Sequence, residues 1–473
     1  MADQNRIAVL GAGPGGYAAA FLAADLGMQV TLIDEEPNPG GVCLYRGCIP
    51  SKALLHVAKL ISEAREAEAW GVTYAEPKID LDKMRSWKED VVGKMTGGLG
   101  VLSSQRKIDY VQGRAELQAG KEILVRGGEG DRRVAFDKAI VATGSRPTRI
   151  GSLWLDSERM WDSTAALALE SIPSSLLVIG GGYIGLELGS VYAALGTKVT
   201  VVEMLPGLLP GADRDLVSVV AKRVGASFES VLLSTSVSKL EETKSGLKAT
   251  FATDNGKDAP PAQTFDRVLM SVGRTPNTEG LGLDAVGLSV SERGFIDVNE
   301  QRMTAVDGIY AIGDIAGEPG LAHKATHEGR TAAEAAAGHR VAFEPQAIPA
   351  VVFTDPELAW CGLTETQAKE QGRDIKVMKF PWGASGRATT MGRNDGLTKL
   401  IVDPGSERLL GMGVVGSGAG ELIAEGTLAV EMAALATDLR LTIHPHPTLS
   451  ETVMETADMF FGQSTHIYRP LKK

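Results

Sequence analysis

Cysteine is scarce in this chain, with only Cys43, Cys48 and Cys361 among 473 residues. Three cysteines cannot form the disulfide framework of a small secreted protein. No run of about 18 apolar residues occurs, so we expect no membrane-spanning helix and no membrane partner. The chain passes from Met-Ala-Asp-Gln-Asn-Arg directly into an apolar strand, without the basic leader, apolar core and cleavage site of a secretory signal. These absences predict a cytoplasmic protein.

An excess of positive charge is also absent, because 48 Lys and Arg residues face 59 Asp and Glu residues and the net charge is −11. Since binding to a phosphate backbone needs a basic surface, we expect no nucleic-acid partner. Glycine, in contrast, is abundant at 56 residues, which indicates many tight turns. The length predicts several domains of about 100–200 residues each.

Two segments repeat one pattern without a gap: residues 7–34, IAVLGAGPGGYAAAFLAADLGMQVTLID, and residues 176–203, LLVIGGGYIGLELGSVYAALGTKVTVVE. Each copy has an apolar strand, a G-x-G-x-x-G turn, a helix, and a second strand that ends in an acid. The residues concerned are Gly11, Gly13, Gly16 and Asp34 in the first copy, and Gly180, Gly182, Gly185 and Glu203 in the second.

Each part of this pattern has a physical reason. The first glycine makes the tight turn, the second admits a pyrophosphate, and the third lets the helix pack on the strand. The phosphates then lie at the helix N-terminus, and the acid accepts a hydrogen bond from a ribose hydroxyl. A single glycine turn also occurs without a ligand. The full order, present twice, predicts two dinucleotide-binding domains.

The acid of the second copy bears on the choice between NAD and NADP. The carboxylate of Glu203 would repel the 2′-phosphate of NADP, and the first arginine after it is Arg214. No cation is therefore close in sequence, and NAD is favoured. The alternative is that Glu203 simply ends a solvated strand.

Two of the cysteines lie close together in residues 40–52, GGVCLYRGCIPSK. In a regular α-helix the Cα atoms of Cys43 and Cys48 would be about 8.6 Å apart, whereas a disulfide needs roughly 4.4–6.8 Å. The pair can form a redox-labile bridge only if the chain leaves the regular helix. Gly47 permits this departure, and Pro50 favours it by pushing the preceding residue out of the α region. Two unrelated buried thiols are the alternative.

Two further residues are harder to interpret. Lys52 follows Cys48 by one helical turn, where its charge would favour a Cys48 thiolate or a reduced, anionic flavin. It could equally be a solvated lysine. Cys361 has no thiol partner nearby in the apolar run ELAWCGL, and we expect it to be structural.

The C-terminal segment 444–451, HPHPTLSE, offers a base for thiol chemistry. His446 could act as the base and Glu451 could orient it, because the thiolate is the nucleophile in such chemistry. Thr448 and Glu451 also fit a helix capping box, and one carboxylate could serve both roles. The His-Pro-His triplet could belong to a metal site, but no third ligand is evident, and we expect no metal.

Taken together, the motifs closely resemble those of the flavin-dependent pyridine nucleotide–disulfide oxidoreductases, over nearly the whole chain. The segments that carry the resemblance are GAGPGG, GGVCLYRGCIPSK, ATGSRP at 142–147, GGGYIGLE at 180–187, SVGRTPNT at 271–278, AIGDIAG at 311–317, LAHKATHEG at 321–329, VVFTDPELAWCGLTE at 351–365 and HPHPTLSE.

The resemblance implies an α/β fold with two Rossmann-like dinucleotide-binding domains, one for FAD and one for NAD, and a C-terminal α+β dimerisation domain. It implies four segments. These are residues 1–147 for the first part of the FAD domain, 148–275 for the NAD domain, 276–345 for a central segment completing the FAD side, and 346–473 for the dimerisation domain.

The resemblance also implies roles for individual residues. Cys43 and Cys48 would form the redox-active disulfide, Lys52 would pair with Glu187 beside the flavin, and Asp314 would hold the flavin ribityl chain. The implied FAD-binding residues are Gly11, Gly13, Gly16, Asp34, Lys52, Gly113, Thr143, Gly144, Asp314 and Ala322. The implied NAD-binding residues are Gly180, Gly182, Gly185, Glu203 and Gly273.

Departures from the family pattern are few. Tyr183 occupies the position that shields the nicotinamide face of the flavin, where many members have Ile or Val. Pro445 stands where Ala is common, and the residues between the two cysteines differ from the frequent Leu-Asn-Val-Gly. Neither of the last two changes touches a reacting atom.

The implied function is oxidation of protein-bound dihydrolipoamide with NAD, in 2-oxoacid dehydrogenase or glycine cleavage complexes. The expected partner is the lipoyl domain of an acyltransferase or of a glycine cleavage carrier protein, supplied in trans because the first strand begins at about Arg6. The resemblance also implies a homodimer in which His446 and Glu451 complete the partner's site.

Two alternatives remain at this point. Another NAD(P)H-dependent disulfide or metal-ion reductase of the same family is one. The arginines that usually follow the second acid for NADPH are missing, and no cysteine pair follows Cys361 as in mercuric reductases. A non-catalytic nucleotide-binding subunit is the other, and the retained thiols and histidine argue against it.

Overall fold

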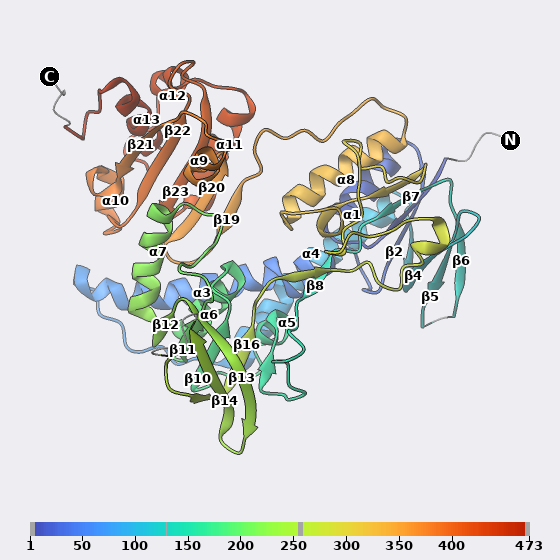
Figure 1. Ribbon diagram of the computed structural model, residues 1–473, viewed down its shortest axis with the longest axis horizontal. Helices are drawn as coiled ribbons and strands as arrows, with labels where there is room; N and C mark the ends of the chain where they lie inside the picture. Colours follow the sequence, from blue (N-terminus) through green and yellow to red (C-terminus); the bar gives the residue numbers. More distant parts are fainter. Residues whose placement is uncertain (1–4, 129, 254–258, 469–473) are drawn as a thin grey trace.

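The computed structural model describes residues 5–128, 130–253 and 259–468. Figure 1 shows an N-terminal lobe at the right, a second lobe below and a C-terminal lobe at the upper left. Two long helices, α3 (Cys48–Glu66) and α4 (Leu81–Gln105), lie between them, and α3 packs against α6 (Tyr183–Ala194) of the second lobe. None of the helices in the described ranges combines the length and apolarity needed to cross a bilayer.

The N-terminal lobe is built on a parallel sheet with the strand order β18-β7-β1-β2-β3. Its strands are β1 (Arg6–Leu10), β2 (Gln29–Asp34), β3 (Asp109–Gln112), β7 (Lys138–Val141) and β18 (Ile309–Ala311). One face is covered by α1 (Pro14–Asp25) and α8 (Ala322–Ala336), and the other by antiparallel β4 (Arg114–Gln118), β5 (Glu122–Arg126) and β6 (Arg132–Ala135). The strands β1, β7 and β18 are largely apolar because both faces of the sheet are buried there, whereas the edge strand β3 is mostly polar and exposed.

The second lobe repeats this plan. Its parallel sheet has the order β12-β11-β10-β16-β9, again with an antiparallel three-stranded sheet beside it. The elements are β9 (Met160–Trp161), β10 (Ser175–Ile179), β11 (Lys198–Val202), β12 (Ser230–Leu232), β13 (Thr235–Thr243), β14 (Gly246–Thr253), β15 (Gln263–Phe265), β16 (Arg267–Met270), α5 (Ser163–Ala168) and α7 (Arg214–Ser227). The internal repeat of the sequence therefore corresponds to two similar folding units.

The chain crosses between these two lobes twice, through a pair of short strands. β8 (Ser145–Pro147) and β17 (Arg274–Pro276) pair antiparallel. The expected segment ends at residues 147 and 275 fall in these paired strands. After the second crossing the chain returns to add β18 to the first sheet.

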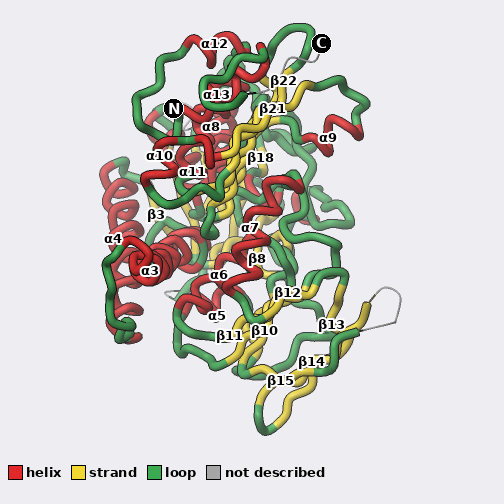
Figure 2. The backbone as a smooth tube through the Cα atoms, turned by 90° about the vertical axis from the view of Figure 1, so that its left-hand side faces the viewer, coloured by secondary structure: helices red, strands yellow, loops and turns green. Residues whose placement is uncertain are grey.

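The C-terminal lobe holds an antiparallel sheet in the order β19-β20-β23-β22-β21. Its elements are β19 (Ala350–Val352), β20 (Glu357–Gly362), β21 (Lys376–Pro381), β22 (Leu397–Val402), β23 (Leu409–Gly416), α9 (Glu365–Glu370), α10 (Gly386–Thr390), α11 (Ala419–Glu431), α12 (Ala436–Leu441) and α13 (Glu451–Asp458). Figure 2 shows β21 and β22 at the opposite end of the molecule from β13–β15. The α/β class with an α+β C-terminal domain is confirmed.

A buried lysine joins the second and C-terminal lobes. Lys399 of β22 is 1% exposed, and its Nζ lies 2.5 Å from Asp213, 2.8 Å from Asp215 and 2.9 Å from Glu365. Asp213 directly precedes α7, so this charge cluster fixes the start of α7 against the C-terminal sheet. Removing one partner of a buried ion pair is costly because the other charge stays buried.

We therefore expect Lys399→Met to destabilise the protein by about 3–5 kcal/mol, measured as a lower midpoint of chemical unfolding. The matched control is Lys239→Met, which removes an exposed pair with Glu241 and is expected to cost only about 0–1 kcal/mol. Equal effects of the two substitutions would show that the cluster does not hold the lobes together.

Candidate active site

The two glycine turns have the same steric arrangement. A Cβ on Gly11 would lie 2.4 Å from the Ala142 carbonyl oxygen, and one on Gly16 would lie 1.8 Å from the Gly11 carbonyl oxygen. In contrast, a Cβ on Gly13 would meet nothing within 4 Å. The first and third glycines are therefore required by the fold, whereas the second faces open space in front of the N-terminus of α1. A bound pyrophosphate needs that space.

The second turn repeats this arrangement. A Cβ on Gly180 would lie 2.5 Å from the Ser271 carbonyl oxygen, one on Gly185 would lie 2.4 Å from the Gly180 carbonyl oxygen, and one on Gly182 would meet nothing within 4 Å. Gly273 has a φ of +117° just beyond β16, a conformation that favours glycine. Both turns thus fit a dinucleotide.

The acids at the ends of the second strands close these turns. One oxygen of Asp34 accepts from Ala12 N–H at 2.6 Å and the other from Glu36 N–H at 2.9 Å. Glu203 accepts in the same way from Gly181 and Leu205, both at 2.7 Å. Burial raises the pKa of Asp34, against the lowering effect of its backbone hydrogen bonds.

Glu203 is 7% exposed, so the alternative that it ends a solvated strand is wrong. Arg214, the first arginine after it, donates to the carbonyl oxygens of Leu208, Leu209 and Ala212. This guanidinium is thus occupied within its own loop and is not free to bind a 2′-phosphate.

We therefore expect NAD to exceed NADP by orders of magnitude in kcat/KM, because the buried carboxylate of Glu203 repels a 2′-phosphate and Arg214 is not free to bind one. Steady-state assays with each nucleotide measure this ratio. Glu203→Gln, which removes the charge at constant shape, should narrow it. Comparable use of both nucleotides by the unchanged enzyme would contradict the assignment.

Most of the expected FAD residues line one pocket, which runs from the first glycine turn to α6. The expected residues that line it are Gly11, Gly13, Asp34, Lys52, Thr143, Gly144, Asp314 and Ala322. Gly16 lies behind the turn. Gly113 lies outside the pocket lining, at the end of β3, where its N–H donates to the Asp34 carbonyl oxygen. The elongated pocket and the open space at Gly13 fit a flavin dinucleotide.

The two cysteines meet at a break between helices. α2 (Gly41–Arg46) ends at Arg46, and α3 begins at Cys48. Gly47 between them has φ −142° and ψ −115°, outside the helical region. A Cβ on Gly47 would lie 2.7 Å from the Val42 carbonyl oxygen, so a larger residue would separate the two helix ends. Both cysteines are free thiols, and both line the pocket described above. The expected departure from a regular helix is present.

The expected role of Pro50 is wrong. Ile49 lies within α3 rather than outside the α region, and the break lies wholly at Gly47. Pro50 is tolerated because the N–H groups of the first helical turn have no intrahelical partner, so its missing donor costs nothing.

The two thiols differ in acidity. The hydrogen bond from Cys43, and then the charge of Lys52, lower the pKa of Cys48 to about 7, against the opposing effects of burial and of Glu187. The same hydrogen bond, together with burial, raises the pKa of Cys43 above its usual range. Cys48 is therefore the thiol that carries the negative charge near neutral pH.

Lys52 is held in place by a buried carboxylate, as expected. Its Nζ lies 2.8 Å from Oε2 of Glu187, whose side chain is 3% exposed. Glu187 also accepts from the Ser51 hydroxyl and from Phe353 N–H, and Lys52 lies 4.5 Å from the centre of the Phe353 ring. The ammonium is therefore fixed beside Cys48 and is not a freely solvated lysine.

These pKa shifts predict the pH dependence of Cys48 alkylation in the reduced protein. Iodoacetamide should react with Cys48 with a midpoint near pH 7 and with Cys43 only at higher pH, because the thiolate is the reactive form. Trypsin cleaves at Arg46, between the two cysteines, so mass spectrometry can follow each one. Lys52→Met should move the Cys48 midpoint upward, while Lys52→Arg keeps it. If the midpoint of Lys52→Met equalled that of the wild type, Lys52 would not be the group that stabilises the Cys48 thiolate.

The histidine and its acid form a pair on the C-terminal lobe. His446 Nδ1 lies 2.9 Å from Oε1 of Glu451, while Oε2 accepts from Thr448 N–H at 2.8 Å. Burial raises the pKa of Glu451, but the hydrogen bonds from Thr448 and His446 outweigh it and lower the pKa. The imidazole is 76% exposed, and neither residue lines the pocket of the cysteines. A single chain therefore does not bring His446 to the thiols.

The expected capping box is only half formed. The Thr448 hydroxyl donates to the Pro445 carbonyl oxygen, and Ser450 occupies the N-cap position of α13. Glu451 serves both the turn and the histidine, with one oxygen for each.

Cys361 is buried among the core residues of the C-terminal lobe, a cluster that contains neither of the other two cysteines.

Among the pocket residues that were not predicted from the sequence, three form hydrogen bonds between the crossing strands and the FAD side. Ser145 donates to Asp314, and Arg274 donates to the Ser145 hydroxyl at 2.7 Å. Asn277 donates to the Thr143 carbonyl oxygen at 3.0 Å. They lie in or beside the crossing strands β8 and β17, and only the pairing of those strands brings them together.

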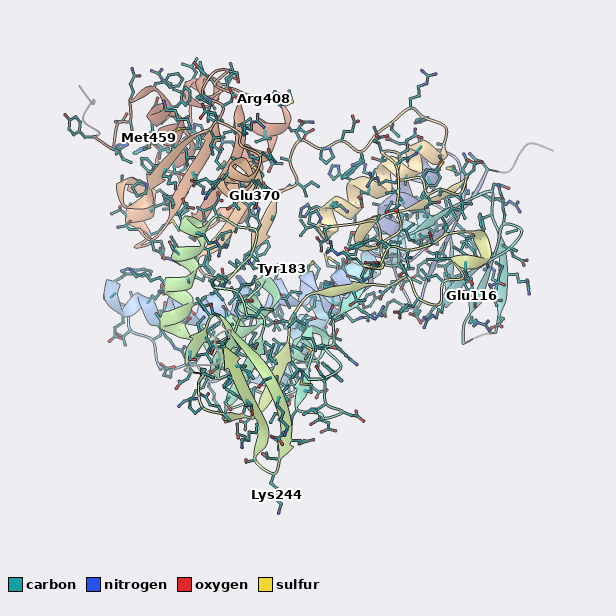
Figure 3. All side chains as sticks on the ribbon, in the orientation of Figure 1. Glu116, Tyr183, Lys244, Glu370, Arg408 and Met459 are labelled. Carbon is teal, nitrogen blue, oxygen red and sulfur yellow. The ribbon has the colours of Figure 1, made fainter. Side chains whose placement is uncertain are left out.

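Tyr183 lines the same pocket where the lobes meet (Figure 3), and burial raises its pKa to about 12.

Comparison with known proteins defines the class of this protein. Residues 5–329 match the model of the pyridine nucleotide-disulphide oxidoreductases, and residues 348–457 match the dimerisation domain of that family. Among solved structures, LpdA from Mycobacterium tuberculosis has a TM-score of 0.89 at 28% identity and covers 96% of this chain and 99% of its own. The flavoprotein disulfide reductase RclA from Escherichia coli has a TM-score of 0.85 at 27% identity, with coverage of 97% and 99%. The chain belongs to the pyridine nucleotide-disulphide oxidoreductase family.

Within that family the full-length relatives are more specific. The chain is 47% identical over 465 residues to dihydrolipoyl dehydrogenase of Vibrio cholerae serotype O1, covering 98% of this chain and 97% of that protein. It is 46% identical to the enzyme of the same name from Thermus scotoductus, covering 97% and 98%. The chain groups with the dihydrolipoyl dehydrogenases. The matched family models and these relatives support the prediction that the protein uses FAD and NAD and forms a homodimer.

Proposed function

We propose that this protein oxidises protein-bound dihydrolipoamide to lipoamide and passes the electrons to NAD+. The observation that carries the proposal is the thiol pair at the Gly47 break. Cys43 and Cys48 lie side by side on the pocket that fits FAD, and Lys52 supports a thiolate at Cys48. Full-length relatives named dihydrolipoyl dehydrogenase support the choice of substrate.

The thiol chemistry follows from the different roles of the two cysteines. His446 accepts the proton of one dihydrolipoyl thiol, and the resulting thiolate attacks Cys43 Sγ, which breaks the Cys43–Cys48 bond and releases Cys48 as a thiolate. The second dihydrolipoyl sulfur attacks the mixed disulfide at the lipoyl sulfur. This step forms the lipoyl S–S bond and leaves Cys43 as a thiol. The pocket residues, Asp34 and Asp314 among them, would hold FAD beside the dithiol. Bound there, FAD would supply the two-electron acceptor that restores the disulfide and the hydride donor for NAD+.

The low pKa of Cys48 suits it to be the released sulfur, because a more acidic thiol leaves faster. Lys52 and Glu187 keep that thiolate in place without taking part in bond changes. Glu451 holds His446 through Nδ1, which leaves Nε2 to exchange the proton.

We propose that each active site is shared by two chains, with His446 and Glu451 of one chain facing Cys43 and Cys48 of the other. The separation of the histidine pair from the pocket of its own chain supports this.

We propose the lipoyl domain of an acyltransferase or of a glycine cleavage carrier protein as the partner. The segments 1–147, 148–275, 276–345 and 346–473 are proposed as the functional division. A cytoplasmic location is proposed because free thiols such as Cys361 persist in reducing compartments.

The test is a steady-state assay of dihydrolipoamide oxidation, coupled to NADH formation, with lipoyl domains from each complex as substrates. Robust activity with a lipoyl domain and NAD+ is expected. A flavoprotein that reduces another disulfide or a metal ion with NAD(P)H, but not this substrate, would establish the alternative. The 43–47% identities to dihydrolipoyl dehydrogenases favour the first outcome.

A further inference from the structure

The turn that carries His446 has little backbone support. α12 ends at Leu441 and α13 begins at Glu451. Within the described residues 443–447, no backbone N–H donates a hydrogen bond, and the Thr448 hydroxyl is the only group that donates to a backbone carbonyl of this stretch. Side chains must therefore fix the position of the turn. Glu451 does so on the side of α13 through His446 and Thr448.

On the other side of the turn, burial is the reverse of what polarity predicts. The apolar side chain of Ile443 is 95% exposed, whereas the His444 side chain is only 5% exposed. A polar ring is buried in place of an apolar one only where its hydrogen bonds are satisfied. The His444 ring meets this condition on both nitrogens: Nε2 lies 2.7 Å from Oε1 of Glu425 on α11, and Nδ1 lies 3.0 Å from the Thr442 carbonyl oxygen.

These two partners tie the ring to the fold on both sides. Glu425 belongs to α11, and Thr442 directly follows the end of α12, so the ring joins the start of the turn to α11. Among the described residues, Glu425 is the only ionisable group within ion-pair distance of the ring.

We propose that His444 is a positioning residue of the active site: its buried ring bridges Glu425 and Thr442 and so fixes the entry side of the turn that presents His446. This proposal rests on the proposed function, because it assigns His444 a role in placing the catalytic base. The turn is then held at both ends by histidine–glutamate pairs, His444–Glu425 to α11 and His446–Glu451 to α13. Only the second pair takes part in proton transfer.

The test uses Glu425→Gln, His444→Gln and the double variant of the full-length, FAD-loaded dimer. Two activities are measured: dihydrolipoamide oxidation with NAD+, and reduction of ferricyanide by NADH, which needs the flavin but not His446. Each single variant should lower kcat for dihydrolipoamide about tenfold to a hundredfold, the range for losing a charge-assisted hydrogen bond. The KM for NAD+ and the ferricyanide rate should stay unchanged. The double variant should lose no more than the single ones, because both remove the same contact.

The control is His339→Gln, which makes the same substitution at an exposed histidine beyond α8 and should leave both activities unchanged. A further measurement does not depend on a variant's folding: spectra of ¹⁵N-histidine-labelled wild-type enzyme should show a ring N–H signal that exchanges slowly with solvent, because the His444 ring is buried and hydrogen-bonded. The His444→Gln sample assigns that signal where it folds.

The outcomes separate the two proposals. Inactivity of the wild type toward dihydrolipoamide would reject the proposed function without addressing His444. An active wild type with unimpaired Glu425→Gln and His444→Gln variants would overturn the positioning role. So would parallel losses in both activities, which indicate general damage, and so would ¹⁵N spectra without a slowly exchanging ring N–H.

Discussion

Replacement of Cys48 by serine should abolish dihydrolipoamide oxidation, lowering kcat by at least about a thousandfold, as for removal of a reacting group in other enzymes. Serine cannot form the disulfide with Cys43 that accepts the electron pair, and it is not ionised near neutral pH. Reduction of ferricyanide by NADH should persist, because the cofactor sites remain intact. Stopped-flow and steady-state assays of both reactions measure the contrast.

Cys361→Ala is the matched control, because it removes a buried thiol from the core of the C-terminal lobe without touching the pocket. Its dihydrolipoamide activity should stay within a fewfold of wild type. Near-normal activity of Cys48→Ser would rule out the thiol-exchange scheme, whatever the control shows.

Replacement of His446 by glutamine is expected to have the second largest effect. Loss of a positioned general base lowers rates about 10²–10⁴-fold, and the dihydrolipoamide reaction should fall by that amount while the ferricyanide reaction is retained. Glu451→Gln should have a smaller effect, because it disturbs only the orientation of the ring.

His466 supplies a matched control for this prediction. Its Nδ1 lies 2.5 Å from Oε1 of Glu455, one turn beyond Glu451 on the same helix, so an exposed histidine again pairs with a glutamate of α13, here a buried one. His466→Gln should change the rate only fewfold. If His466→Gln were as damaging as His446→Gln, the base would not be assigned to His446.

The repeated dinucleotide turns could be predicted from the sequence because their chemistry is local. Gly11 and Gly16 are separated by five residues, and the clash that excludes a Cβ at Gly16 involves the Gly11 carbonyl oxygen itself. The same holds for Gly180 and Gly185. Where a motif contains both the residue and the group that constrains it, spacing alone identifies the turn.

Contacts between distant segments could not be predicted in this way. Glu187 is held by Phe353 N–H, 166 residues away, and Lys399 reaches Asp213 across 186 residues. The sequence pattern pointed to Glu187 through family resemblance but gave no signal for Phe353 or Lys399. Their positions depend on how the lobes pack, which no local spacing encodes.

Local rules also failed where two of them competed. The bias of a residue before proline placed Ile49 outside the helix, but the start of α3 at Cys48 makes the missing donor of Pro50 harmless. At Thr448, the spacing of a capping box was correct for the carboxylate of Glu451 and wrong for the hydroxyl, which bonds to Pro445 instead.

The measurement that tests the central claim most directly is complementation between two inactive chains. Cys48→Ser and His446→Gln enzymes are mixed under conditions that allow subunit exchange, and formation of mixed dimers is verified with differently tagged chains. If each site combines the thiols of one chain with the histidine of the other, a mixed dimer contains one site with both lesions and one with neither. Its dihydrolipoamide activity should then rise toward half that of the wild type. Absence of recovery in verified mixed dimers would place His446 with the cysteines of its own chain and contradict the shared active site.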